Sequence, residues 1–144
     1  MIQTSSQEET INFIVNDLFR SIVYEKGVSF YSGPFGRLLF LAHYLQYHPE
    51  ENDDRFDRYA EQCFDAICSK PAIHTYCNGM AGVLECLRHL TRSGRLEVDY
   101  SEVEEQYKPH LLQCLQRDFA RDGDYDLLHG AMGVAYHFRE DETF

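Results

Sequence analysis

The sequence has no tryptophan, no apolar run long enough to span a bilayer and few basic residues. Its 13 Lys and Arg residues are outnumbered by 24 Asp and Glu residues, so the formal net charge is −11. This charge repels phosphate backbones and anionic lipid headgroups, and we therefore expect no nucleic acid and no membrane among the partners. Residues 1–10 are polar and acidic, unlike the start of a signal peptide, which favours a cytoplasmic location.

A disulfide framework is not expected either, because the five cysteines are odd in number. Most of them stand at spacings that suit the apolar faces of helices, so reduced thiols are predicted at Cys63, Cys68, Cys77, Cys86 and Cys114. With 144 residues, of which 44% are hydrophobic, the chain is long enough to form one packed domain over residues 1–144.

The strongest positive signal is an internal repeat built on the pattern G-x-x-G. The three copies read "YSGPFGRLLFLAHYL", "YCNGMAGVLECLRHL" and "LLHGAMGVAYHF", and each glycine pair opens an apolar stretch. The first glycines are 46 residues apart (33 to 79) and then 51 residues apart (79 to 130). The structural glycines predicted at the start of three inner helices are Gly33, Gly36, Gly79, Gly82, Gly130 and Gly133.

Amphipathic helices are predicted between these segments. Apolar residues recur at helical spacing over residues 11–22, over 53–70 and from residue 101 onward, whereas residues 37–45 are apolar almost all round. An enclosed helix has the second pattern and a half-exposed helix has the first. Each repeat is therefore interpreted as one outer amphipathic helix followed by one inner helix.

The ends of the outer helices carry recognisable signals. Capping boxes are predicted at Ser5-x-x-Glu8 and Ser101-x-x-Glu104, and Gly27 and Pro71 should end the first two outer helices. Pro109 should kink or restart the third outer helix.

Period-2 alternation is scarce, so the fold class is predicted to be all-α. Helical hairpins at this period stack as an open solenoid or close into an α/α toroid. Glycines at the start of every inner helix favour the toroid, because their small size lets the helix N-termini crowd around an axis.

These three segments resemble the first three repeats of the lanthionine synthetase C-like proteins, the cyclases of lanthipeptide biosynthesis. The resemblance covers roughly residues 8 to 138 and implies an α/α toroid, of which this chain would form about three of six hairpins. The chain is thus expected to be the N-terminal part of such a toroid, with a peptide substrate or the remainder of the toroid as its partner.

In that family, two cysteines and one histidine hold a zinc ion that activates a substrate thiolate for addition to a dehydrated serine or threonine. The zinc ligands lie in later repeats, in Trp-Cys-x-Gly and Cys-His-Gly motifs that this sequence lacks. The resemblance therefore implies no zinc and no other cofactor in this chain, and no cyclase activity by the chain alone.

One family catalytic position is matched, because Asp126 in "YDLLHG" stands where the third repeat carries an aspartate beside the metal. The resemblance implies an acid/base or orienting role for Asp126. A carboxylate just before an apolar helix is also a common helix cap, and the two roles are compatible.

The remaining polar candidates have structural alternatives. Cys77 with His74 supplies two potential ligands, whereas a zinc site needs about three or four, so a buried structural thiol is the favoured reading. Four histidines are predicted as candidates for lining the central channel, with polar ends of buried helices as the alternative: His43, His89, His129 and His137.

Two further function classes remain open. Half a toroid has two open edges, so a non-catalytic peptide-binding or scaffolding module that pairs with a second copy of itself is one alternative. A glycosidase on an α/α toroid is another, although Asp126 has no evident carboxylate partner. The G-x-x-G segments lack the further glycine and lysine of a phosphate-binding loop, so they indicate packing rather than nucleotide binding.

Overall fold

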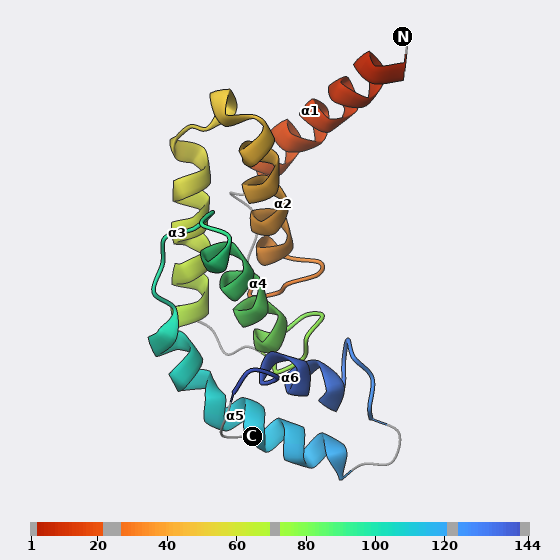
Figure 1. The fold of residues 1–144 in the computed structure, drawn as a ribbon, viewed down its shortest axis with the longest axis vertical. Coiled ribbons are helices and arrows are strands. Elements are labelled where there is room, and N and C mark those ends of the chain that lie inside the picture. Colours follow the sequence, from red (N-terminus) through yellow and green to blue (C-terminus); the bar gives the residue numbers. More distant parts are fainter. Residues whose placement is uncertain (1–2, 22–26, 70–72, 121–123, 142–144) are drawn as a thin grey trace.

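The computed structural model describes residues 3–21, 27–69, 73–120 and 124–141, and these residues contain helices but no strand. The predicted all-α class is therefore confirmed (Figure 1). In chain order the helices are α1 (Gln3–Ser21), α2 (Pro34–Tyr47), the short 3-10 helix η2 (Pro49–Glu51), α3 (Asp54–Ser69), α4 (Met80–Arg92), α5 (Ser101–Phe119) and α6 (Ala131–His137).

The three glycine-opened helices form one row, in which α2 packs against α4 and α4 packs against α6. The amphipathic helices lie outside this row: α3 packs against α2, and α5 packs against both α4 and α6. The inner helices α2 and α4 therefore each contact the outer helix of the following repeat. At one end of the molecule, α1 extends away from the row (Figure 1).

Burial follows the predicted periodicity. Outer helix α3 buries one stripe, formed by Phe56, Tyr59, Cys63 and Ile67, and leaves its other faces in solvent. The central inner helix α4 is buried on most sides, and residues 80–84 have almost no exposed surface. Burying apolar side chains contributes roughly 25 cal/mol per Å² of apolar area, so α4 is the centre of the core.

The loops that lead into the inner helices, here called the lead-in loops (residues 27–33, 73–79 and 124–130), explain the second glycine of each pair. A Cβ atom on Gly36, Gly82 or Gly133 would stand 2.5, 1.9 and 2.2 Å from a carbonyl oxygen in the lead-in loop of the same repeat. That oxygen always belongs to the residue three positions before the first glycine. The glycines are needed because each loop folds back onto the first turn of its own helix.

Neighbouring lead-in loops are joined by backbone hydrogen bonds. The Tyr31 N–H donates to the Cys77 carbonyl at 2.7 Å, and the Cys77 N–H donates to the Leu128 carbonyl at 2.8 Å. All three residues stand two positions before the first glycine of their repeat, so the bonds form a ladder across the three repeats. The ladder fixes the register of one repeat on the next.

Several predicted helix ends were wrong or lie outside the described residues. Helix α1 already begins at Gln3, so Ser5 is not its N-cap. Tyr100 rather than Ser101 is the N-cap of α5, and the Ser101 N–H is held by the Asp99 carboxylate at 3.0 Å. Residues 22–26 and 70–72, with the expected ends of α1 and α3, are not described.

Helix α5 does not restart at Pro109. It runs without interruption from Ser101 to Phe119 and curves along its length (Figure 1). No helix among the described residues combines the length and the apolarity needed to cross a membrane.

Replacing Gly82 by alanine should cost about 3 kcal/mol of unfolding free energy, because the added methyl group meets the Tyr76 carbonyl oxygen. The matched control is Gly94→Ala, where φ is +67° and nothing lies within 4 Å of the new Cβ. That variant should lose about 1 kcal/mol from the left-handed backbone alone. Urea denaturation followed by circular dichroism measures both, and equal losses would contradict the close-packing explanation.

Candidate functional site

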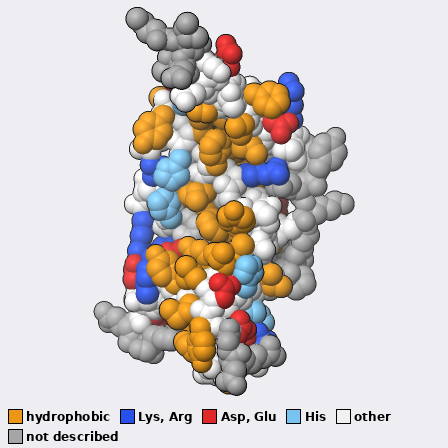
Figure 2. Space-filling view, turned by 90° about the vertical axis from the view of Figure 1, so that its right-hand side faces the viewer, with side chains coloured by type: hydrophobic (Ala, Val, Ile, Leu, Met, Phe, Trp, Pro, Cys, Tyr) orange, Lys and Arg blue, Asp and Glu red, His pale blue; other side chains and the backbone are white. Residues whose placement is uncertain are grey.

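A cavity of about 460 Å³ opens on the shared face of the inner helices. Its walls come from two lead-in loops, from α2, α4 and α6 and from the residues just after α6, and among the described lining residues none belongs to an outer helix. Figure 2 shows the side of the molecule that carries the lead-in loops, where apolar side chains gather along the long axis with histidines among them. The lining residues are Phe30, Leu39, His43, Tyr76, Glu85, Cys86, His89, Tyr136 and Arg139.

Two of the predicted channel histidines meet in this cavity. The Nε2 atoms of His43 and His89 are 3.0 Å apart, and the ring centroids are 5.2 Å apart. Burial lowers the pKa of His43, and the nearby charges of Arg95 and His89 lower it further. A hydrogen bond between two ring nitrogens requires one N–H and one lone pair, so the pair holds one proton between the two facing atoms.

A carboxylate and an arginine form another part of the wall, Glu85 on α4 and Arg139 just after α6. Both oxygens of Glu85 accept hydrogen bonds from Arg139, at 2.9 and 3.0 Å, and the guanidinium lies 4.0 Å above the Tyr136 ring. Burial by itself raises the pKa of Glu85, but bonds to His137 and Arg139 and the charge of Arg88 outweigh it and bring the pKa to about 2. The carboxylate is therefore ionised, and the cavity has a fixed ion pair beside an aromatic surface.

Aromatic rings continue this surface from repeat to repeat. Phe30 meets Tyr76 edge to face at 5.9 Å, and Tyr76 meets Tyr136 in the same way at 5.9 Å. Cys86 closes the floor, and burial raises the pKa of its thiol to about 12. Because the thiolate is the nucleophilic form, Cys86 is a packing residue here.

His137 does not join the other two channel candidates. It stands seven residues after the first glycine of its repeat, whereas His43 and His89 stand ten residues after theirs, where the third repeat has Glu140. Its side chain is fully buried on the α5 side of α6. Of the four histidines predicted to line a central channel, His43 and His89 line this cavity.

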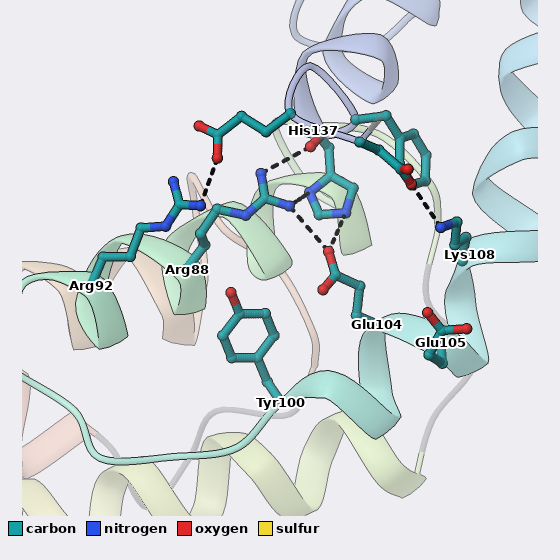
Figure 3. Close-up of a pocket in the computed structure, with 10 residues that line it drawn as sticks. Arg88, Arg92, Tyr100, Glu104, Glu105, Lys108 and His137 are labelled. Carbon is teal, nitrogen blue, oxygen red and sulfur yellow. Dashed lines mark hydrogen bonds and ion pairs between the residues drawn. The ribbon is translucent and has the colours of Figure 1, made fainter. Parts of the chain in front are cut away.

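The surroundings of His137 form an ion-pair network around a second pocket of about 300 Å³ (Figure 3). The Arg88 guanidinium donates to the His137 carbonyl at 2.9 Å and to Glu104 at 3.0 Å, and His137 Nε2 lies 3.2 Å from the same Glu104 oxygen. Arg92 is paired with Glu140 and Lys108 with Asp141. Because each of these cations already has a carboxylate partner, the pocket is best explained as a structural joint between α4, α5 and α6.

Asp126 lies in the third lead-in loop with half of its side chain exposed. Its Oδ2 accepts the His129 backbone N–H at 2.7 Å and lies 2.8 Å from the His129 Nδ1 atom. The bond from the His129 backbone lowers the pKa of Asp126 most, with help from the His129 ring and the Leu128 N–H. Neither Asp126 nor His129 lines the inner-face cavity.

The turn made by Asp126 has a counterpart in the second repeat. Thr75 stands at the same position, four residues before the first glycine, and its hydroxyl accepts the Asn78 N–H at 3.3 Å. The first repeat has Ser29 there. A side-chain acceptor at this place thus shapes the lead-in loop, and Gly130 rather than Asp126 is the N-cap of α6.

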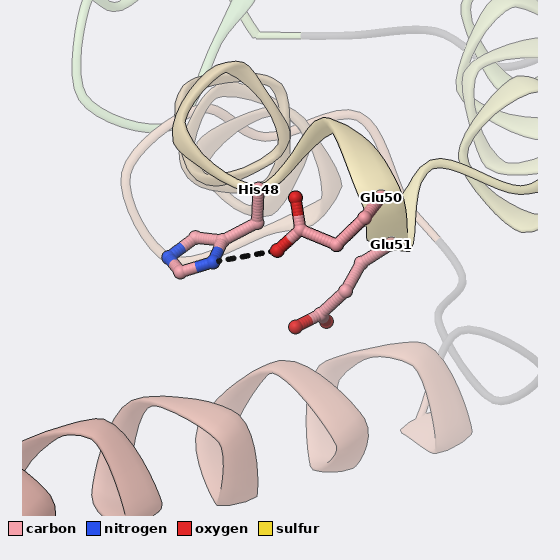
Figure 4. A group of neighbouring side chains, drawn as sticks. All are labelled: His48, Glu50 and Glu51. Carbon is pink, nitrogen blue, oxygen red and sulfur yellow. Dashed lines mark ion pairs between the residues drawn. The ribbon is translucent and has the colours of Figure 1, made fainter.

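The described residues do not fit the two-cysteine, one-histidine zinc set of the resembling family. Cys77 is buried and its backbone is part of the loop ladder, while His74 Nε2 binds Asp118 Oδ2 at 2.8 Å. All five cysteines are free. In the described part of the chain, three potential donor side chains come within 4.8 Å of one another at His48, Glu50 and Glu51, on the rim after α2 and without a thiolate (Figure 4).

Several cavity residues were not anticipated from the sequence: Tyr76, Glu85, Tyr136 and Arg139. An aromatic residue three positions before the first glycine in two repeats was a usable signal for Tyr76. Glu85 and Arg139 are 54 residues apart and have no local pattern that relates them.

Comparison with known protein families gives a match over most of the chain. The family model described as Lanthionine synthetase C-like protein matches residues 24–142, which include all three G-x-x-G segments. No curated protein and no solved structure matches the chain.

Replacing Arg88 by alanine should lower the unfolding free energy by about 3 to 5 kcal/mol, because Glu104 and the His137 carbonyl lose their buried partner. Arg92→Ala is the matched control, since its pair with Glu140 is exposed and such pairs contribute about 0 to 1 kcal/mol. Chemical denaturation of both variants tests the network, and a loss at Arg88 no greater than at Arg92 would contradict it.

The unfolding free energy should depend on Glu85 between pH 5 and pH 2. The folded pKa of about 2 is below the ordinary value of 4.5, so the stabilisation is fully present above pH 4.5 and is lost as the pH falls toward 2. The difference between the wild type and Glu85→Gln should shrink by about 3 kcal/mol over this range. Glu61→Gln, on an exposed face of α3, is the control, and a pH-independent difference for Glu85→Gln would refute the assignment.

Proposed function

The chain belongs to the lanthionine synthetase C-like family, and on that premise we propose that it forms three hairpins of an α/α toroid whose inner wall binds a peptide. The observation that carries this proposal is the cavity on the shared face of α2, α4 and α6. Function is thereby assigned to the inner helices, and the outer helices support them.

The chemistry of the cavity suits a peptide. Tyr76 and Tyr136 offer aromatic surface for apolar side chains, and the His43–His89 pair can donate to or accept from backbone amides. Arg139 is held in place by Glu85, so a peptide meets a pre-organised wall and little conformational entropy is lost on binding.

We assign to Asp126 an orienting or proton-accepting role that is conditional on a complete toroid. The low pKa of its carboxylate keeps it ionised, and its exposed side chain is accessible from solvent. Its hydrogen bonds in the lead-in loop hold it in one orientation. In this chain, the turn at the start of α6 is the role that the contacts of Asp126 support.

We also propose that the chain alone neither holds the family's zinc ion nor closes thioether rings. This rests on the donor sets in the described residues, where the buried Cys77 and the Asp118-bound His74 offer no two-cysteine, one-histidine site. The function that remains for this chain is recognition of the peptide.

A fluorescein-labelled peptide that contains one cysteine and one dehydroalanine tests the proposal. Fluorescence anisotropy should detect binding, and Tyr136→Ala should raise the Kd about tenfold because the aromatic wall is lost. Tyr47→Ala, an exposed tyrosine outside the cavity, should leave the Kd unchanged. The peptide thiol should remain open to alkylation, as measured by mass spectrometry.

Two results would count against the proposal. Failure to bind the peptide at millimolar protein would refute the binding function. Thioether formation by the zinc-supplemented chain would refute the statement that the chain alone does not cyclise.

A further inference from the structure

Each repeat has one side that faces the following repeat, and the position two residues after the first glycine lies on it. In the first repeat this residue is Phe35, whose carbonyl accepts a bond from the Cys86 thiol of the second repeat at 3.4 Å. Phe35 and its counterpart Ala81 are both fully buried. At the same position of the third repeat, Met132 is 46% exposed. Met132 therefore stands at a position that is buried in the first two repeats, and its apolar side chain is exposed.

The other side of each repeat faces the preceding repeat, and the position seven residues after the first glycine lies there. Cys86 contacts Phe35, and His137 lies 3.7 Å from Glu85, so both are buried by the repeat before them. Phe40 has this position in the first repeat and is 41% exposed. The two ends of the row therefore leave opposite halves of one repeated interface uncovered.

The lead-in loops show the same asymmetry. A Cβ atom on Gly82 would lie 3.0 Å from the Phe30 Cβ of the preceding repeat, and one on Gly133 would lie 2.6 Å from the Tyr76 Cβ. The three atoms nearest to a Cβ on Gly36 all belong to its own lead-in loop. Leu127, the counterpart of Phe30 and Tyr76, is half exposed at the other end.

The outer helices complete the pattern. Helix α3 packs on α2, and α5 packs on both α4 and α6, so α2 and α4 each contact the outer helix of the next repeat. Helix α1 is the outer helix of the first repeat, and it exposes Phe13 (72%) with Ile11 and Ile14 on its surface. An exposed apolar stripe on a helix at the end of a row marks a contact surface.

We propose that a second copy of this chain docks its first repeat on the third repeat of the first copy. The repeated interface would then continue across the two chains: Phe40 would meet Met132, Gly36 would pack on Leu127, and α1 would contact α6 as α3 contacts α2 and α5 contacts α4. A second copy is the partner that carries both complementary sides by construction. This step rests on the proposed toroid: because three hairpins form about half of it, two copies cover all four ends in one closed symmetric dimer.

The net charge of the chain predicts how dimerisation depends on salt. Each chain carries a formal net charge of −11, so two copies repel each other at long range. Apolar contacts hold the proposed interface, and added salt screens the repulsion. Dimerisation should therefore strengthen as the salt concentration rises.

Light scattering coupled to gel filtration tests the proposal on the full chain. The wild type should elute with twice the chain mass of 16.9 kDa. Phe40→Glu and Met132→Lys should each raise the dimer Kd at least tenfold, because a charge is placed in an apolar contact. The double variant should return to within about threefold of the wild type, since each contact then pairs Glu with Lys.

Tyr47→Glu, which adds the same charge at an exposed tyrosine at the end of α2, is the control and should leave the dimer intact. Circular dichroism confirms that each variant is folded. A wild-type chain that remains a monomer at millimolar concentration overturns the proposal. A dimer that is unaffected by both single variants, or one that the double variant does not restore, overturns the head-to-tail register. Neither result depends on peptide binding, so the proposed function is tested separately.

Discussion

The close contact between each lead-in loop and the first turn of its inner helix is the constraint on which the arrangement of the three repeats depends. At Gly36, Gly82 and Gly133 a Cβ atom would clash with a carbonyl oxygen of the loop, so the loop can pack against the helix only with glycine there. When the loops pack in this way, the backbones of Tyr31, Cys77 and Leu128 form a hydrogen-bonded ladder. The ladder sets the spacing of α2, α4 and α6, and through them the shape of the cavity.

The same geometry separates two groups of polar residues that look alike in the sequence. His43 and His89 lie on the face that the inner helices share, whereas His137, which stands nearer to its glycine, lies in the joint with α5. The joint is closed by Arg88 and Glu104 and stabilises the packing of α4, α5 and α6. Glu85 links the two sites, because it lines the cavity and also accepts a hydrogen bond from Arg88 at 3.1 Å.

The helical class, the order of outer and inner helices and the three glycine pairs were predictable, because hydrophobic periodicity and G-x-x-G are local signals. The capping-box pattern did not predict the start of α5, because Glu104 binds Arg88 of another helix instead of capping the N-terminus of α5. The partnership of Glu85 with Arg139 was also beyond the sequence, because side chains in different repeats meet only after the repeats have packed. The helix cap considered for Asp126 was wrong, because Gly130 is the N-cap of α6 and Asp126 instead bonds within the loop before it, as Thr75 does in the second repeat.

Amide hydrogen exchange at Tyr31 and Cys77, followed by NMR, tests the central claim most directly. Both amides lie in loops, where exchange is ordinarily fast, and Tyr31 has a largely exposed side chain. If the ladder joins the repeats, both amides should be protected nearly as strongly as the amides of α4 and should exchange by global unfolding. Exchange at the rate of an open loop would contradict the claim that the loop ladder sets the row of inner helices.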